Sequence, residues 1–258
     1  MMELSKDNYF SQEANMAYMS VSQFKSFEKC EAAAMAELNG EWVRDKTPAL
    51  LVGAYVDAYF EGTLDEFKAE NPEIFKKDGS LKAEYVKAEK IIERIESEPA
   101  FMEMLAGEKQ VIMTGVIEGV PVKIKMDSYF FGEKIVDLKV MKDFEPMWKD
   151  SQKMPWFAAW EYDLQGAVYQ EVVEQNTGHR LPFYLAAATK EPVTDIGGVH
   201  IPQEFLNERV AYFKGMVPHY DNIKKGLVEP TRCGKCDYCK STKKFEIVDA
   251  SDIYYDLE

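Results

Sequence analysis

Apolar and charged residues alternate most clearly in the middle of the chain, between residues 120 and 140. The segment VPVKIKMD places Val122, Ile124 and Met126 on one side of an extended chain and its lysines on the other. This period of two is typical of a β-strand with one buried face. After Gly132 the apolar run IVDLKV predicts a second strand. We therefore expect an antiparallel hairpin that turns at Gly132.

Three chemically active side chains come together if these two strands pair. Asp127 ends the first strand, and Asp137 and Lys139 are two residues apart in the second, so both leave the same face of the sheet. Carboxylates bind Mg²⁺ or Mn²⁺, and a neighbouring lysine can orient an attacking water or screen charge on a phosphodiester. The bare tripeptide Asp-x-Lys is common, and a surface hairpin whose Asp and Lys face solvent is the alternative.

The rest of the chain alternates between helical and extended patterns. Apolar positions with the helical period, with serine caps or Gly and Pro at their ends, predict helices over residues 20–40, 48–62, 82–97, 98–107, 156–177 and 203–225. Further strands are expected over residues 109–117, 120–127, 135–140, 181–188 and 197–201, the first three as one antiparallel run. Cys30 falls inside the first helix, and Val86 and Phe205 fall on faces expected to be buried. The prediction is an α/β fold with a central mixed sheet flanked by helices.

Length and charge set limits on this fold and its function. With 258 residues the chain has room for a real core, and we expect one domain over residues 1–258. Within it, residues 20–106 form an N-terminal helical part, 109–225 the core and 226–258 a cysteine-containing tail. The sequence has no signal-peptide pattern and no membrane-length apolar run, which predicts a cytoplasmic protein with no membrane partner. A net charge of −14 argues against a sequence-reading DNA-binding module, but less against an enzyme that encloses its substrate.

Two predicted helices carry polar residues one turn apart. Gln165 and Tyr169 share one face of the long helix over residues 156–177, where an ordinary polar stripe is the alternative. Gly53 and Asp57 have the same spacing in the helix over residues 48–62. Taken alone, Asp57 on a helix is an ordinary solvated residue.

The order of these motifs along the chain resembles the PD-(D/E)xK nuclease superfamily, and within it the RecB-like and RecE-like exonucleases of the phage type. In that group a GxxxH helix precedes an Asp at a strand end, a D/E-x-K strand and a QxxxY helix. The similarity covers residues 20–239 and is carried by Gly53-Ala54-Tyr55-Val56-Asp57, Asp127, Asp137-Leu138-Lys139 and Gln165-Gly166-Ala167-Val168-Tyr169. Asp57 stands where the family has His. A carboxylate there keeps a ligand suited to Mg²⁺ or Mn²⁺, or alters metal preference, or weakens the enzyme.

The resemblance also implies roles for the other motif residues and for the protein. Asp127 and Asp137 would be metal ligands, Lys139 the catalytic lysine, and Gln165 and Tyr169 would support the site or grip the DNA backbone. The implied fold is a restriction-endonuclease-like core. The implied activity is a Mg²⁺- or Mn²⁺-dependent exonuclease that degrades the ends of linear double-stranded DNA in phage-type recombination. A single-strand annealing protein as partner and a ring-like homo-oligomer are implied as well.

Two other classes of function fit the same sequence. A nuclease-fold protein with little or no activity, serving as a DNA-binding or assembly subunit, is favoured by Asp57 and by the negative charge. The intact set of Asp127, Asp137 and Lys139 argues against it. A zinc-ribbon-bearing binding module with an incidental hairpin would require the cysteine tail to fold separately from the core.

All four cysteines of the chain can belong to one site. Cys233, Cys236 and Cys239 are spaced by two residues, and Cys30 is the only other cysteine. In a cytoplasmic chain such spacing favours metal binding over disulfides. Three close cysteines and a distant one are typical of iron–sulfur ligation, and zinc on four thiolates or free thiols in a flexible tail are the alternatives. Some RecB-like nucleases are similar, with one Cys before the nuclease core and three after it.

Aromatic residues gather just before the long helix. Trp148, Trp156, Phe157 and Trp160 can line a DNA path by stacking on bases, although such clusters more often belong to the core.

Overall fold

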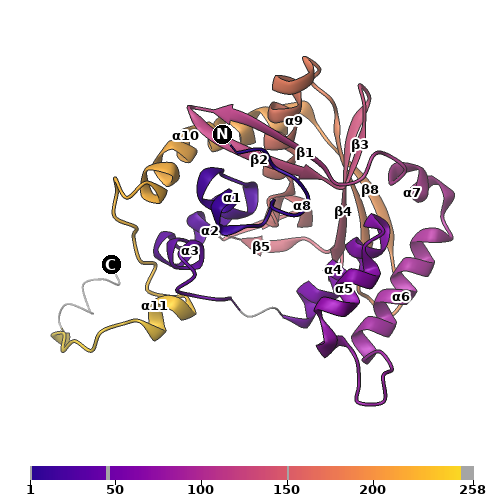
Figure 1. Cartoon of the computed structure of the whole chain (residues 1–258), viewed down its shortest axis with the longest axis horizontal. Coiled ribbons are helices and arrows are strands. Elements are labelled where there is room, and N and C mark those ends of the chain that lie inside the picture. Colours follow the sequence, from indigo (N-terminus) through magenta and orange to yellow (C-terminus); the bar gives the residue numbers. More distant parts are fainter. Residues whose placement is uncertain (1, 45–46, 150, 251–258) are drawn as a thin grey trace.

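The structure is a computed structural model that describes residues 2–44, 47–149 and 151–250 (Figure 1). Its strands are β1 (Val111–Ile117), β2 (Val120–Met126), β3 (Ser128–Phe130), β4 (Lys134–Met141), β5 (Met147–Lys149), β6 (Gln152–Met154), β7 (Phe183–Thr189) and β8 (Ile196–Ile201). The N-terminal helices are α1 (Gln12–Ala17), α2 (Val21–Lys29), α3 (Glu31–Leu38), α4 (Pro48–Glu61), α5 (Leu64–Glu70), the 3₁₀ turn η1 (Pro72–Ile74), α6 (Ala83–Glu96) and α7 (Pro99–Met104). The later helices are α8 (Trp156–Ala159), α9 (Tyr162–Thr177), α10 (Gln203–Lys224) and α11 (Asp237–Ser241).

A four-stranded sheet in the order β3-β4-β7-β8 lies at the centre of the molecule. Strands β4 and β7 run parallel and the other neighbours are antiparallel, so the predicted mixed sheet is confirmed. Because neighbouring residues of a strand point to opposite faces, Ile135 joins the core beneath α9 and α10, whereas Val136 joins the core beneath α4 and α6. Helices therefore cover both faces of the sheet (Figure 1).

The pairing expected for residues 109–140 is wrong in one respect. Strand β2 pairs with β1, but the hairpin that turns at Gly132 joins β4 to the short strand β3. Asp127 is the single residue between β2 and β3. Its side chain accepts a hydrogen bond from the backbone N–H of Leu138. The Asp127 side chain thus contacts β4 where the expected hairpin would have placed backbone hydrogen bonds between β2 and β4. Gly132 has a φ of 73°, a turn conformation that glycine adopts without strain.

Two predicted helices are each broken into two. The helix expected over residues 20–40 is interrupted at Cys30, which has an extended backbone (φ −170°, ψ 109°) and separates α2 from α3. The helix expected over residues 156–177 is interrupted at Glu161, whose φ is 57°. Ion pairs to Lys149 (3.1 Å) and Arg209 (3.4 Å) hold Glu161 in this uncommon conformation. Nothing in the sequence pattern predicts the β5–β6 hairpin.

Burial was predicted correctly for most apolar residues but not for all side chains. Val86 and Phe205 are exposed rather than buried, each on the solvent side of its helix. Lys123 is buried although it belongs to the charged face of β2, and it donates hydrogen bonds to the carbonyl of Tyr9 and the side chain of Asn15 (2.7 Å for the latter). The N-terminal segment therefore covers this face of the β1–β2 hairpin.

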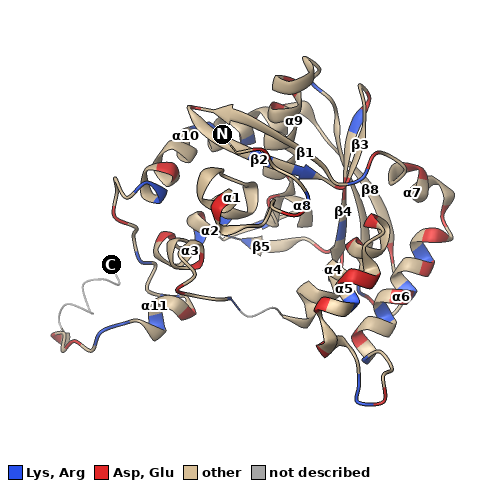
Figure 2. Ribbon diagram, in the orientation of Figure 1, with Lys and Arg blue, Asp and Glu red and all other residues tan. Residues whose placement is uncertain are grey.

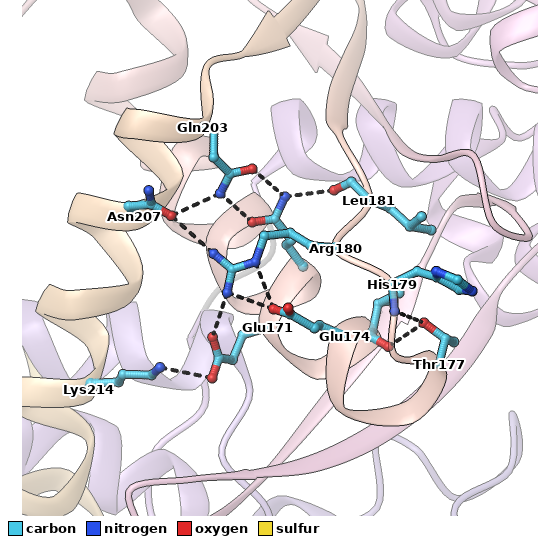
Figure 3. Close-up of polar contacts among 11 residues, drawn as sticks. Glu171, Glu174, Thr177, His179, Arg180, Leu181, Gln203, Asn207 and Lys214 are labelled. Atoms are coloured by element: carbon cyan, nitrogen blue, oxygen red, sulfur yellow. Dashed lines mark hydrogen bonds and ion pairs between the residues drawn. The ribbon is translucent and has the colours of Figure 1, made fainter.

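Helices α9 and α10 are joined by a polar network around Arg180 (Figure 3). The Arg180 guanidinium binds Glu174 of α9 (2.7 Å) and Asn207 of α10 (3.2 Å). The side chains of Gln170 and Gln203 exchange hydrogen bonds of 2.7 and 3.0 Å. These contacts fix the helix that carries Gln165 and Tyr169.

No helix in the described parts of the chain combines the length and hydrophobicity that are needed to cross a bilayer.

Close packing between α9 and the sheet can be tested at Gly166. A methyl group at this position would lie 2.3 Å from the ring of Phe183 in the core. We expect Gly166→Ala to lower the free energy of unfolding by about 1–3 kcal/mol, because the helix must move away from β7. Denaturant unfolding followed by circular dichroism measures this change.

Gly215→Ala in α10 is the matched control, since nothing lies within 4 Å of the added methyl group. It should raise the free energy of unfolding by about 0.5–1 kcal/mol, the usual gain for Ala over Gly inside a helix. Equal effects of the two substitutions would contradict the close approach of α9 and β7.

Candidate active site

Asp127, Asp137 and Lys139 lie close together although their strands do not form the expected hairpin. The Oδ2 atom of Asp127 accepts a hydrogen bond of 3.0 Å from the backbone N–H of Leu138 in β4. This bond brings Asp127, just after β2, beside the centre of β4. The convergence that the sequence predicts therefore forms through a side chain and not through a strand ladder.

Asp137 is the most buried carboxylate of the site, with only 1% of its surface exposed. Its Oδ1 accepts a hydrogen bond of 2.7 Å from the Gln165 side chain in α9. Its Oδ2 forms an ion pair with the ammonium group of Lys139, which also lies 4.8 Å from the centre of the Tyr162 ring. The structure thus brings Gln165 to the site, as expected from the QxxxY motif.

Tyr169 contributes to the site indirectly. Its ring is buried, and its hydroxyl donates a hydrogen bond of 2.9 Å to the backbone carbonyl of Lys125 in β2. The contact holds the end of β2, and with it Asp127, against α9. Of the two roles expected for Tyr169, this arrangement matches support of the site.

Asp57 reaches the site from α4 and lies one helical turn before Glu61. Both residues line a small cavity of about 10 Å³ together with Asp127 and Lys109, roughly the space of one water molecule. The Oδ1 atom of Asp57 is buried and has no hydrogen-bond partner among the described residues. A buried oxygen without a partner is costly, so this position favours a ligand that neutralises it.

Glu61 and Gln110 are site residues that sequence reasoning missed. The Gln110 amide donates to Glu61 (2.7 Å) and more weakly to Asp127 (3.4 Å), and its backbone is in the left-handed region with a φ of 57°. Glu61 could have been found, because its spacing of four residues places it on the same face as Asp57. Nothing in the local sequence identifies Gln110.

The carboxylates of the site repel one another. Burial and then the charge of Asp127 raise the pKa of Asp137 to about 7, and the same two causes raise the pKa of Asp57 well above its ordinary value. Burial also raises the pKa of Glu61. Burial disfavours the charged form of Lys139, but the charges of Asp137 and Asp127 outweigh it and raise the Lys139 pKa.

This excess of negative charge fits a bound divalent cation. Carboxylate oxygens are the hard ligands that Mg²⁺ and Mn²⁺ prefer, and Asp57, Asp127 and Asp137 are the residues that could hold such an ion. The three are spread more widely than a closed metal site. Among the described residues, only the four cysteines place the ligand atoms of three or more His, Cys, Asp or Glu side chains within 4.8 Å of one another.

The four cysteines form a second, separate site. The sulfur of Cys30, between α2 and α3, lies 3.5 Å from that of Cys239 in α11, and the sulfurs of Cys233 and Cys239 are 3.9 Å apart. Both distances exceed that of a disulfide bond. Backbone N–H groups of Lys235 and Cys236 donate to the Cys233 sulfur and lower its pKa to about 6, which favours the thiolate that binds metals.

The cysteine site joins the C-terminal tail to the N-terminal helices. Thr231 donates to Glu31 of α3 through its backbone N–H (2.8 Å) and its hydroxyl (2.7 Å), and Glu31 also contacts His219 of α10 (2.7 Å). The break at Cys30 turns its sulfur toward the tail. The part of the tail from Thr231 to Cys239 is therefore packed on the rest of the chain, unlike the separate module that a zinc-ribbon protein would require.

The aromatic cluster divides into core and surface. Trp156 is buried and stacks on Phe144, with Phe157 packed edge-on against it. Trp148 and Trp160 are exposed, by 73% and 45%. Core packing thus accounts for half of the cluster.

The arrangement of Asp127, Asp137, Lys139 and Gln165 is that expected of a PD-(D/E)xK-type nuclease, and a comparison with known families gives the same class. Residues 20–242 match the family model of the PDDEXK-like domain of unknown function (DUF3799), and the chain belongs to this family. It has the PDDEXK-like nuclease fold.

Solved structures include one that is similar over nearly the whole chain. This is a crystal structure of a protein called "Putative exonuclease" from Eubacterium rectale, with 47% identity, a TM-score of 0.94 and 98% of each chain covered. A structure called SSO0001 has 11% identity and a TM-score of 0.29 over 76% of this chain and 83% of its own, too low to support an argument. No curated protein matches the chain.

Loss of one cysteine tests whether the second site holds a metal. We expect Cys30→Ser to release the bound metal and to lower the free energy of unfolding by about 4 kcal/mol or more, because the tail loses its attachment to α3. Elemental analysis of the purified protein and thermal unfolding measure the two effects. Ser241→Ala in α11 is the control and should change neither. Equal stability and no metal in the wild type and in Cys30→Ser would contradict a metal site.

Proposed function

We propose that the protein is a metal-dependent exonuclease that hydrolyses phosphodiester bonds in DNA. The observation that carries the proposal is the buried Asp137, which is bound by Lys139 and Gln165 and lies beside Asp127. A purely structural role does not require two repelling carboxylates and a lysine at one point of the sheet. The 47% identity to the protein called "Putative exonuclease" supports the same conclusion.

Each residue of the site has a proposed part in the reaction. Asp57, Asp127 and Asp137 would hold Mg²⁺ or Mn²⁺, which activates water and neutralises charge on the phosphodiester when bound. Lys139 would hold the attacking water or the developing charge on the phosphate. Gln165 keeps Asp137 in position, and Tyr169 keeps β2 in place through the Lys125 carbonyl.

The preferred substrate in this proposal is the end of linear double-stranded DNA, in a recombination role of the RecE-like phage type. Degradation of one strand leaves single-stranded DNA, which is the substrate of a single-strand annealing protein, so such a protein is the proposed partner. A homo-oligomer, which would enclose DNA as a ring, and a cytoplasmic location belong to the same proposal. Its support is the resemblance to the RecE-like exonucleases.

The cysteine site is proposed to be structural. Four thiolates suit either an iron–sulfur cluster or Zn²⁺, and both would attach the tail to α3. Assay of iron, acid-labile sulfide and zinc in protein purified without oxygen distinguishes the two.

Loss of the site residues should abolish cleavage. We expect Asp137→Asn and Lys139→Ala each to lower the rate at which a linear duplex is degraded by about 10²–10⁴-fold, because ion binding or positioning of the water is lost. End-labelled duplex with Mg²⁺ or Mn²⁺ is the substrate, and the label released first reports the direction.

Asp143→Asn and Lys142→Ala provide matched controls, because these residues form an ion pair of 3.1 Å at the surface just beyond β4. Both should retain full activity. A wild type that cleaves neither duplex nor single-stranded DNA would instead support the second candidate, an inactive nuclease-fold subunit. The crowding of Asp57 against Asp127, at the position where the RecB-like and RecE-like exonucleases have His, favours that candidate.

Asp57 can be tested by metal binding alone. We expect Asp57→Asn to weaken Mg²⁺ binding at least 10-fold, and Asp57→His to shift the preference from Mg²⁺ toward Mn²⁺, since imidazole is a softer ligand than carboxylate. Isothermal titration calorimetry measures both effects. Asp65→Asn on the exposed surface of α5 serves as control. Unchanged Mg²⁺ affinity in Asp57→Asn would exclude Asp57 as a ligand.

A further inference from the structure

Two cavities adjoin at Lys25, a lysine of α2 that the proposed chemistry does not use. The smaller, of about 130 Å³, is lined by Gln165 and Tyr169 of the catalytic site as well as by Lys25 and Lys123. The larger, of about 510 Å³, is lined by Lys25 and by residues of α2, β5 and α10. Lys25 is therefore part of both walls, so the larger cavity lies next to the one that Gln165 and Tyr169 line.

Positively charged side chains outnumber acidic ones in the lining of the larger cavity, although the chain carries a net charge of −14. Its charged lining comprises Lys25, Lys29, Lys149 and Arg209 against Glu28, Glu161 and Asp163.

The acids of this cavity are largely engaged with its own residues. Glu161 binds both Lys149 and Arg209, at 3.1 and 3.4 Å. Glu28 accepts a hydrogen bond of 2.6 Å from the Tyr212 hydroxyl, and burial raises the Glu28 pKa, which favours its neutral form. Among the described residues, neither Lys25 nor Lys29 forms an ion pair with a carboxylate.

The Lys25 ammonium group lies near the same aromatic ring as that of Lys139, the proposed catalytic lysine. It donates a hydrogen bond to the Trp160 carbonyl and lies 5.4 Å from the centre of the Tyr162 ring. The Lys139 ammonium group lies 4.8 Å from the centre of the same ring. Burial lowers the pKa of Lys25 to about 8, so a nearby anion would stabilise its charged form. Two lysines against one aromatic ring suit two successive phosphates of one DNA strand.

We propose that Lys25 binds the phosphate next to the scissile one, and that the cavity lined by Lys25, Lys29, Lys149 and Arg209 holds this strand in single-stranded form. A volume of about 510 Å³ is that of a small-ligand pocket, which suits one or two nucleotides and is too small for a duplex. The inference rests on the proposed function, because it gives the DNA a path to that same site. It makes Lys25 a substrate-positioning residue.

Lys25→Met tests the inference by binding and by kinetics. We expect this substitution to weaken binding of a fluorescent single-stranded oligonucleotide roughly 10-fold, in buffer with EDTA, and to reduce the slope of log affinity against log salt by about one. The KM for DNA cleavage with Mg²⁺ should rise by a similar factor while kcat stays within about 2-fold, since Lys25 contacts substrate away from the reacting phosphate. Lys25→Arg keeps the positive charge and should restore most of the affinity.

Lys90→Met is the matched control, because it removes one positive charge from the exposed surface of α6, on the other side of the sheet from α2 (Figure 1). It should bind and cleave DNA like the wild type. Binding by Lys25→Met that equals binding by Lys90→Met would overturn the inference. So would a loss of kcat at constant KM, a failure of Lys25→Arg to restore binding, or a Lys25 effect confined to blunt duplex.

The two proposals fail in different ways. A wild type that binds the oligonucleotide through Lys25 but cleaves no DNA would contradict the nuclease function and leave the phosphate site standing. If the wild type cleaves DNA and Lys25→Met binds and cleaves DNA equally well, the nuclease function stands and the phosphate site is contradicted. Thermal unfolding of Lys25→Met and Lys25→Arg shows whether loss of the Trp160 contact changes stability.

Discussion

Burial of the Asp137 carboxylate is the constraint on which the rest of the site depends. A charge with 1% of its surface exposed must be compensated, and here Lys139 and Gln165 compensate it from β4 and α9. Removing one partner of such a buried pair typically costs about 3–5 kcal/mol. The register of β4 and the position of α9 are therefore tied to the chemistry, and the network around Arg180 that joins α9 to α10 stabilises both.

The net charge of −14 does not describe how positive and negative side chains are distributed over the molecule. Acidic residues are frequent along α5 and α6, where basic residues are interspersed with them, as Figure 2 shows. Lysines that face the catalytic site and the adjoining cavity, such as Lys25 and Lys139, are held inside by carbonyls, aromatic rings and carboxylates. A strongly acidic chain can thus still present positive charge beside the proposed active site.

Much of the fold and the site could be predicted, because the informative patterns are local. Alternation in β2 and β4 and the spacing of Gln165 and Tyr169 depend only on the geometry of strands and helices. The errors come from long-range contacts: Asp127 replaces a strand ladder by binding the Leu138 N–H, and Lys123 is buried by an N-terminal segment more than 100 residues away in sequence. The break at Cys30 has the same origin, since its sulfur turns toward the distant tail.

The central claim is that the crowded carboxylates form a cation site, and a crystal structure with Mn²⁺, located by its anomalous scattering, tests it most directly. The account predicts one or two Mn²⁺ ions bound by oxygens of Asp127 and Asp137, with the Lys139 ammonium group displaced from Asp137. The buried Oδ1 of Asp57, which has no hydrogen-bond partner in the part of the chain that the structure describes, should join them. A structure grown with saturating Mn²⁺ that has no ion at these residues and keeps the Lys139–Asp137 ion pair would contradict the account.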